Sequence, residues 1–117
     1  MTIHVRVLIL TVLTLWGALS VSGHAILIHA FPASHQSVEG PKVQVTLRFN
    51  SRIDLKRSRL ALVSPEAREV ALQPGQPTPD TITCEPLELA SGPYVLRWQV
   101  LAVDGHLSRG ELSFLVR

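Results

Sequence analysis

The sequence predicts an all-β protein, a small antiparallel sandwich of six or seven short strands. From residue 24 to the C-terminus, apolar and polar residues alternate with a period of two, as expected of strands that bury one face. No stretch of that segment shows the period of an amphipathic helix. Prolines and glycines recur between the alternating stretches, where turns would join antiparallel strands.

The first part of this segment predicts an opening strand and three more. On Ala25–Ala30, Ile26 and Ile28 share one face, and Phe31-Pro32 ends the strand. The three further strands are Val43–Phe49, Arg59–Val63 and Arg68–Leu72, with a turn at residues 64–67.

The second part predicts a loop and then three strands. Residues 73–79 contain three prolines and one glycine, a composition typical of a loop. The strands that follow are Asp80–Cys84, Tyr94–Val100 and Glu111–Val116. The last two flank a short loop that contains Asp104 and His106.

The N-terminal residues are predicted to be a secretory signal and not part of the fold. Arg6 precedes an apolar run over residues 7–19, and small residues follow at 20–23, which is the order of a cleaved leader. Cleavage after Gly23 gives a leader of residues 1–23 and a domain of residues 24–117 that begins with His24. Cleavage after Ala25, or retention of the leader as an anchor, is the alternative. The expected location is the periplasm or another exported compartment.

Charge and cysteine content narrow the class of function. The chain has eleven Lys/Arg against nine Asp/Glu, a balance that does not suggest a nucleic-acid-binding surface. The only basic cluster, Arg52 to Arg59, is interrupted by Asp54 and is expected to be a solvated strand edge, with an anion site as the alternative. Cys84 is the only cysteine, so no internal disulfide can form. It is expected to be buried, with a disulfide between two copies or a copper(I) ligand as the alternatives, and the protein is expected to be a monomer.

Two separated parts of the sequence hold candidate metal ligands. If His24 becomes the first residue, its free amine and its imidazole can chelate one ion. Asp104-Gly105-His106 adds a carboxylate and a second imidazole, and copper(II) prefers such nitrogen and oxygen donors in a tetragonal arrangement. Asp-Gly-His is also an ordinary turn sequence, and spacing does not show that the two parts meet. His29 and His35 are interpreted as surface residues, with His35 the better placed of the two to approach a metal.

Two stretches of this chain resemble the CopC family of periplasmic copper-binding proteins. The first is HAILIHAFPA at residues 24–33, a histidine followed by a short apolar strand and a Pro-Ala turn. The second is YVLRWQVLAVDGHLSRGELSF at residues 94–114, an aromatic strand that ends in Asp-Gly-His and a closing strand after glycine. The second stretch is the more specific, and the resemblance covers nearly all of residues 24–117.

This resemblance implies a Greek-key sandwich or barrel, immunoglobulin-like or cupredoxin-like. It implies a copper(II) site made by His24, Asp104 and His106, and a role in copper resistance or trafficking without catalysis. The expected partner is an inner-membrane copper transporter of the CopD type. Ser51 stands where many members carry an acidic residue near the copper, and Asp54 is a weak substitute. Met1 is the only methionine, so a methionine-rich copper(I) site is not expected.

Two other functions compete with this interpretation. The first is a metal-free immunoglobulin-like interaction module. The second is a copper enzyme that oxidises polysaccharides through a brace of two histidines. The few aromatic residues are needed mostly for the core and leave no evident face on which sugars could stack.

Overall fold

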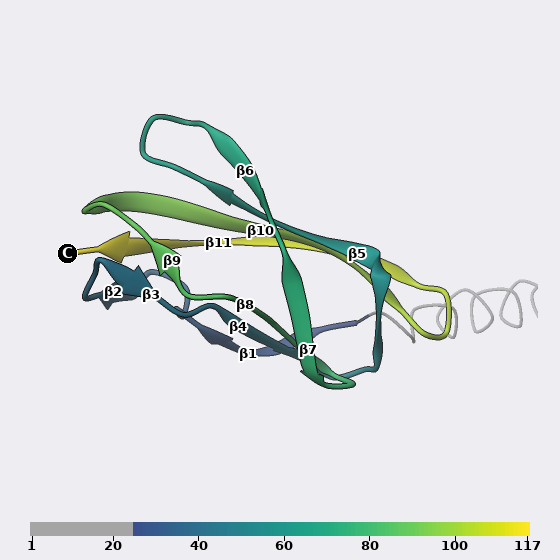
Figure 1. The fold of residues 1–117 in the computed structure, drawn as a ribbon. Helices are drawn as coiled ribbons and strands as arrows, with labels where there is room; N and C mark the ends of the chain where they lie inside the picture. Colours follow the sequence, from purple (N-terminus) through teal and green to yellow (C-terminus); the bar gives the residue numbers. More distant parts are fainter. Residues whose placement is uncertain (1–24) are drawn as a thin grey trace, which may run out of the picture.

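The computed structural model describes residues 25–117, and the predicted leader and His24 lie outside them. The described chain forms eleven strands (Figure 1). They are β1 (Leu27–Phe31), β2 (Ser37–Val38), β3 (Lys42–Val43), β4 (Thr46–Phe49), β5 (Ile53–Val63), β6 (Glu69–Leu72), β7 (Pro74–Thr78), β8 (Thr81–Cys84), β9 (Leu87–Glu88), β10 (Gly92–Ala102) and β11 (Leu107–Val116). Within residues 25–117 no helix is long and apolar enough to span a membrane.

The strands form two facing sheets and one small pair. One sheet has the order β1-β4-β8-β7 and the other β2-β11-β10-β5-β6, while β3 pairs with β9. Neighbours are antiparallel except β2, which pairs in parallel with the end of β11. The prediction of a small antiparallel sandwich is therefore confirmed.

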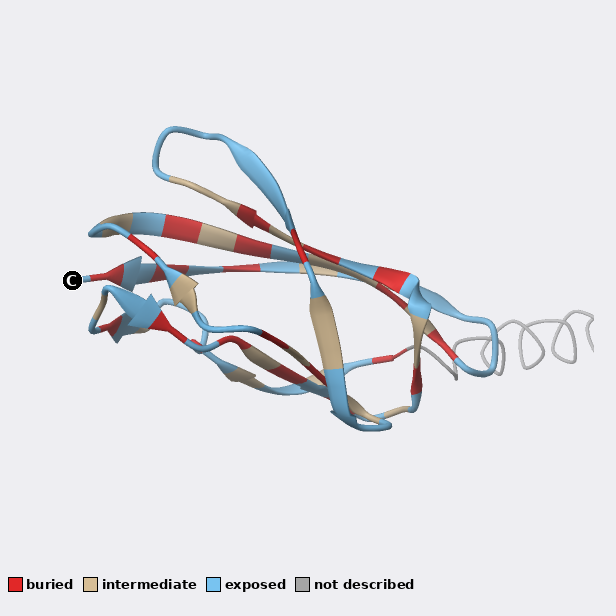
Figure 2. Cartoon of the chain, viewed as in Figure 1, coloured by how far each residue is buried: buried red, intermediate tan, exposed pale blue. Residues whose placement is uncertain are grey.

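The core lies between the two sheets and consists of side chains from alternate strand positions. Figure 2 shows buried and exposed positions alternating along β10 and β11. Phe49, Leu47 and Leu96 are fully buried at its centre. The Tyr94 ring stacks on Phe114 at 5.7 Å between ring centroids, and its hydroxyl donates to the Ala90 carbonyl at 2.8 Å. Aromatic pairs of this kind contribute about 0.5–1.5 kcal/mol beyond the area that they bury.

Cys84 belongs to this core, as predicted. It is a free cysteine and only 5 % exposed. Burial raises the pKa of its thiol, which keeps the sulfur protonated and poorly reactive.

Two predicted elements differ from the structure. Residues 73–79 are not a loop, because Pro74–Thr78 forms β7 and pairs with β8. Since β7 is the edge strand of its sheet, prolines fit there without removing a hydrogen bond from a second neighbour. The predicted strand Val43–Phe49 is divided into β3 and β4, which join different sheets.

The first strand faces the other way from the prediction. Ile26 and Ile28 are 60 % and 53 % exposed, whereas Leu27 and Ala30 pack against the core. The pairing of β1 with β4 shifts register between Leu27 and His29. An irregularity of this kind adds an unpaired residue and breaks the strict alternation on which the prediction rested.

Trp98 lies across a glycine of the neighbouring strand. Gly110 is its partner in the β10–β11 ladder, and a Cβ atom at Gly110 would collide with the indole ring. The Trp98 ring also meets Phe49 edge-on, at 6.4 Å between centroids. The missing side chain at position 110 thus makes the room in which Trp98 bridges the two sheets.

We expect Gly110→Val to lower the free energy of unfolding by about 1–3 kcal/mol, because the new side chain overpacks the indole. Chemical denaturation followed by tryptophan fluorescence measures the loss. The matched control is Gly75→Ala, since a Cβ atom there meets only Thr83 at ordinary contact distances. Equal stability of the Gly110→Val and Gly75→Ala proteins would contradict this account of the packing.

Candidate metal site

The loop between β10 and β11 is a tight turn that presents Asp104 and His106. The Ala102 N–H donates to the His106 carbonyl and the Gly105 N–H to the Ala102 carbonyl, both at 2.9 Å. Gly105 has a φ of 95°, a left-handed conformation that favours glycine. The Asp-Gly-His sequence therefore forms an Asp-Gly turn, and this turn brings both candidate ligands to one side of the loop.

Asp104 and His106 contact each other directly. An Asp104 carboxylate oxygen accepts the His106 main-chain N–H at 3.1 Å and lies 3.2 Å from the imidazole Nδ1. These hydrogen bonds, the main-chain one first, lower the pKa of the Asp104 carboxyl. The carboxylate is therefore ionised at neutral pH. Both side chains are about half exposed, so an ion from solvent can reach them.

The spacing of this pair fits two ligands of one metal ion. Donors held about 2.0–2.2 Å from an ion, at right angles to each other, are about 3 Å apart. Asp104 Oδ1 and His106 Nδ1 lie 3.2 Å apart, which is also the length of the hydrogen bond between them, so an ion would have to displace the Nδ1 proton to bind both atoms. One carboxylate oxygen and one imidazole nitrogen in adjacent positions suit the tetragonal preference of copper(II).

A short segment joins this loop to the start of the described chain. Asn50 holds Ile26 at two points: its side-chain oxygen accepts the Ile26 N–H at 2.7 Å, and its own N–H donates to the Ile26 carbonyl at 2.9 Å. Two residues farther on, the Arg52 carbonyl accepts the Val103 N–H at 3.0 Å. The segment preceding β1 and the β10–β11 loop therefore lie at the same end of the sandwich (Figure 1).

Ser51 lies within this connecting segment, between the residue that holds Ile26 and the residue that holds Val103. Its hydroxyl is directed to the Arg52 carbonyl at 3.5 Å. Asp54, the substitute considered above, instead makes an ion pair with Arg57 at 3.8 Å. Within residues 25–117 no group of three or more His, Cys, Asp or Glu side chains could hold a metal.

The structure therefore brings together two of the three predicted ligands, and His24 lies outside the described residues. His29 is exposed on β1, as expected. The His35 N–H donates to the Ser113 carbonyl at 2.6 Å. Ser113 is six positions along β11 from Leu107, about 20 Å in an extended strand. His35 is thus far from the loop, and a ligand role for it is not supported.

Asn50 was not predicted as a functional residue. An asparagine directly after a strand is typical of a turn, and nothing in the local sequence indicates that it binds a segment 24 residues away. Its role becomes visible only when both chain segments are placed.

Comparison with known proteins places the chain in a family. The CopC domain model matches residues 27–117. Protein YobA of Escherichia coli K12 is 28% identical over 102 residues, which cover 84% of this chain and 82% of YobA. The crystal structure of CopC from Methylosinus trichosporium OB3b superposes with a TM-score of 0.72 at 28% identity, over 80% of this chain and 93% of that one.

A second solved structure supports the fold alone. PcoC, a methionine-rich copper resistance protein from Escherichia coli, superposes with a TM-score of 0.62 at 21% identity. The match covers 81% of this chain and all of PcoC. Because the CopC domain match spans most of the sequence, and the sandwich agrees with it, this protein belongs to the CopC family.

Proposed function

We propose that the protein is an exported copper(II)-binding protein that acts in copper resistance or trafficking. The observation that carries the proposal is the Asp104–His106 pair, a carboxylate and an imidazole in contact on an exposed turn beside the start of β1. Membership of the CopC family supports the choice of metal and of role.

The remaining donors of the proposed site come from His24. Ala25 is only 6 % exposed and belongs to the core, and Ile26 is held by Asn50. A residue bonded to Ala25 has its Cα within about 3.8 Å of the Ala25 Cα. Cleavage after Gly23 would therefore free an amine and an imidazole at the end of the sandwich that carries Asp104 and His106.

The proposed set has three nitrogens and one carboxylate oxygen, which suffice for four equatorial positions around copper(II). Ser51 supplies no second carboxylate in the connecting segment, so a water is the expected additional ligand. With one negative protein ligand, the bound copper(II) keeps a net positive charge. This favours a site that takes up and releases the ion over one that retains it permanently.

Release to a partner is the proposed use of this site. The candidate ligands lie on an exposed turn, where a second protein can approach the ion. We propose that an inner-membrane transporter of the CopD type receives copper from the protein in the periplasm, and that the protein itself catalyses no reaction.

The first prediction concerns the ligands. We expect the protein that begins at His24 to bind one copper(II) ion per chain. His24→Ala, Asp104→Asn and His106→Ala should each weaken binding by at least about 10–100-fold, the range that even an outer-shell partner of a metal ligand produces. Competition titration with a chromogenic chelator measures the affinities.

The matched controls for this titration are His29→Ala and His35→Ala, which remove imidazoles outside the proposed ligand set. Both should bind copper like the unaltered protein. If the unaltered protein loses copper to a weak chelator, a metal-free interaction module becomes the better interpretation.

The second prediction concerns the N-terminus. We expect one glycine added before His24 to lower copper affinity and change the electron paramagnetic resonance spectrum, because the amine moves away from the imidazole of that residue. A glycine inserted after Ser64, in the turn between β5 and β6, is the control and should change neither. An exported protein whose N-terminus, by mass spectrometry, is Ile26 would rule out this ligand set.

The third prediction concerns Asn50. We expect Asn50→Ala to speed hydrogen exchange of the Ile26 amide and to weaken copper binding several-fold, because a hydrogen bond worth about 0.5–1.5 kcal/mol is lost. Asn50→Asp keeps an acceptor for the Ile26 N–H and should preserve the slow exchange. If exchange at Ile26 is unchanged in Asn50→Ala, the Asn50 side chain does not hold the segment that precedes β1.

A further inference from the structure

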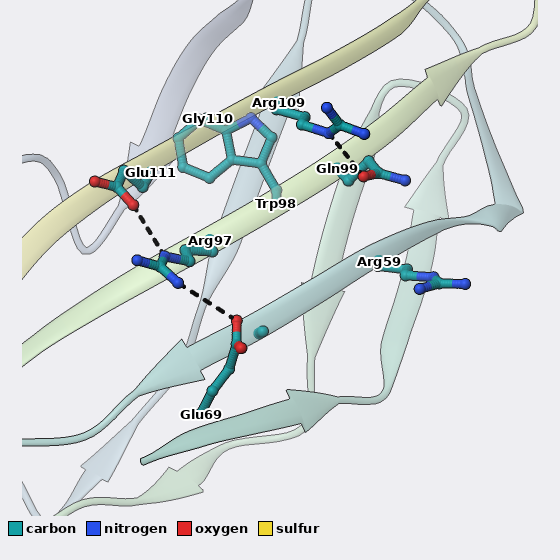
Figure 3. Close-up of a pocket in the computed structure, with 9 residues that line it drawn as sticks. Arg59, Glu69, Arg97, Trp98, Gln99, Arg109, Gly110 and Glu111 are labelled. Atoms are coloured by element: carbon teal, nitrogen blue, oxygen red, sulfur yellow. Dashed lines mark hydrogen bonds and ion pairs between the residues drawn. The ribbon is translucent and has the colours of Figure 1, made fainter. Parts of the chain in front are cut away.

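The outer face of the larger sheet carries a trough with an uneven distribution of charge. It has a volume of about 480 Å³ and crosses β5, β10 and β11 (Figure 3). Its polar lining residues are Arg59, Glu69, Arg97, Gln99, Arg109 and Glu111. The charged side chains lie in rows that run across the sheet, each row made of residues that pair in neighbouring strands.

One row is neutralised from within the protein. Arg97 pairs across the ladder with Glu111, and its guanidinium contacts the Glu111 carboxylate at 3.0 Å. The same guanidinium lies 3.8 Å from the Glu69 carboxylate of β6. Figure 3 shows Arg97 between these two carboxylates. This end of the trough therefore has no positive charge to offer a ligand.

In the next row, the arginines are not neutralised by any carboxylate of residues 25–117. Arg59 pairs with Gln99 in the ladder, and Gln99 pairs with Arg109, so the three residues cross the sheet side by side. Arg109 Nε donates to the Gln99 side-chain oxygen at 2.8 Å. The Arg59 side chain has no ion pair or hydrogen bond within residues 25–117. Both arginines are exposed, and no described carboxylate contacts either guanidinium.

The unused polar atoms of this row are all donors. The Gln99 oxygen already accepts from Arg109, which leaves the Gln99 amide N–H groups and the remaining guanidinium N–H groups of both arginines. A complementary ligand must offer acceptors without donors, and a carboxylate does this with the geometry that guanidinium groups match best. Neighbouring strands are about 4.8 Å apart, so the Arg59 and Arg109 backbones are separated by about 10 Å. Each flexible arginine can therefore take its own carboxylate.

We propose that the Arg59–Gln99–Arg109 row is a docking surface for an acidic segment of a protein partner. Two carboxylates on one extended chain would engage the two arginines together, whereas a single small anion gains little from exposed charges that salt screens. Arg109 follows His106 by three residues, so a partner on this face lies beside the β10–β11 turn. The surface does not depend on copper binding, and it goes beyond the function proposed above.

The test uses the exported chain with and without copper(II). A fluorescent peptide of alternating glutamate and serine should bind, and the same peptide with glutamine in place of glutamate should not. Arg59→Gln combined with Arg109→Gln should weaken binding about tenfold, the effect of two exposed charge pairs of about 0.7 kcal/mol each. Fluorescence anisotropy gives the affinities, and circular dichroism confirms that the variant is folded.

The matched control is Lys42→Gln combined with Arg117→Gln, which removes the same charge from exposed positions that do not line the trough. The control protein should bind the acidic peptide like the unaltered one, and binding should be the same without copper. An equal loss in the control would show non-specific attraction and overturn the proposal. Displacement of the peptide by millimolar inorganic phosphate, or tighter binding to vesicles of anionic lipid, would overturn a protein partner in favour of a small-anion or membrane site.

Discussion

The arrangement of the candidate metal site depends on the hydrogen bonds of one short segment, from Phe49 to Ile53. Its two ends are tied to the turn between β7 and β8, because the Phe49 N–H donates to the Asp80 carbonyl and the Ile53 N–H to the Pro79 carbonyl, both at 2.9 Å. Between these points Asn50 holds Ile26 and Arg52 holds Val103. The segment thus fixes the start of β1 and the β10–β11 turn relative to each other, although about 80 residues separate them in the sequence.

Asp80 stabilises the turn between β7 and β8, to which this segment is tied. Its carboxylate accepts hydrogen bonds from the hydroxyls of Thr78 and Thr81, each at 2.9 Å, and these bonds lower the pKa of Asp80. Arg48 adds a weaker contact at 3.4 Å. Because the group is ionised and bonded at neutral pH, its contribution is present above the ordinary carboxyl pKa and is lost as the pH falls through its lowered value. The geometry of the candidate metal site therefore depends on the hydrogen bonds around Asp80 as well as on the hydrophobic core.

Much of the fold could be predicted from alternation of apolar residues, because a buried face imposes a period of two wherever strands are regular. Prediction failed where the backbone is irregular, and where a strand at the edge of a sheet tolerates prolines that a central strand excludes. The irregularity in β1 places both Leu27 and Ala30 against the core while Ile26 and Ile28 are exposed, and the edge position of β7 accommodated prolines that otherwise indicate a loop. The turn at Asp104-Gly105-His106 was predictable, because its residues are local to one another. The contact between Asn50 and Ile26 was not, because it depends on tertiary placement.

The prolines of β7 have a consequence for how copies of the protein can associate. An uncovered sheet border exposes main-chain groups that can recruit a strand from another molecule, which is a common beginning of aggregation. Pro74 and Pro77 lack the N–H that such recruitment needs, and both lie on the outermost strand of the smaller sheet. This border is therefore a poor template for intermolecular pairing.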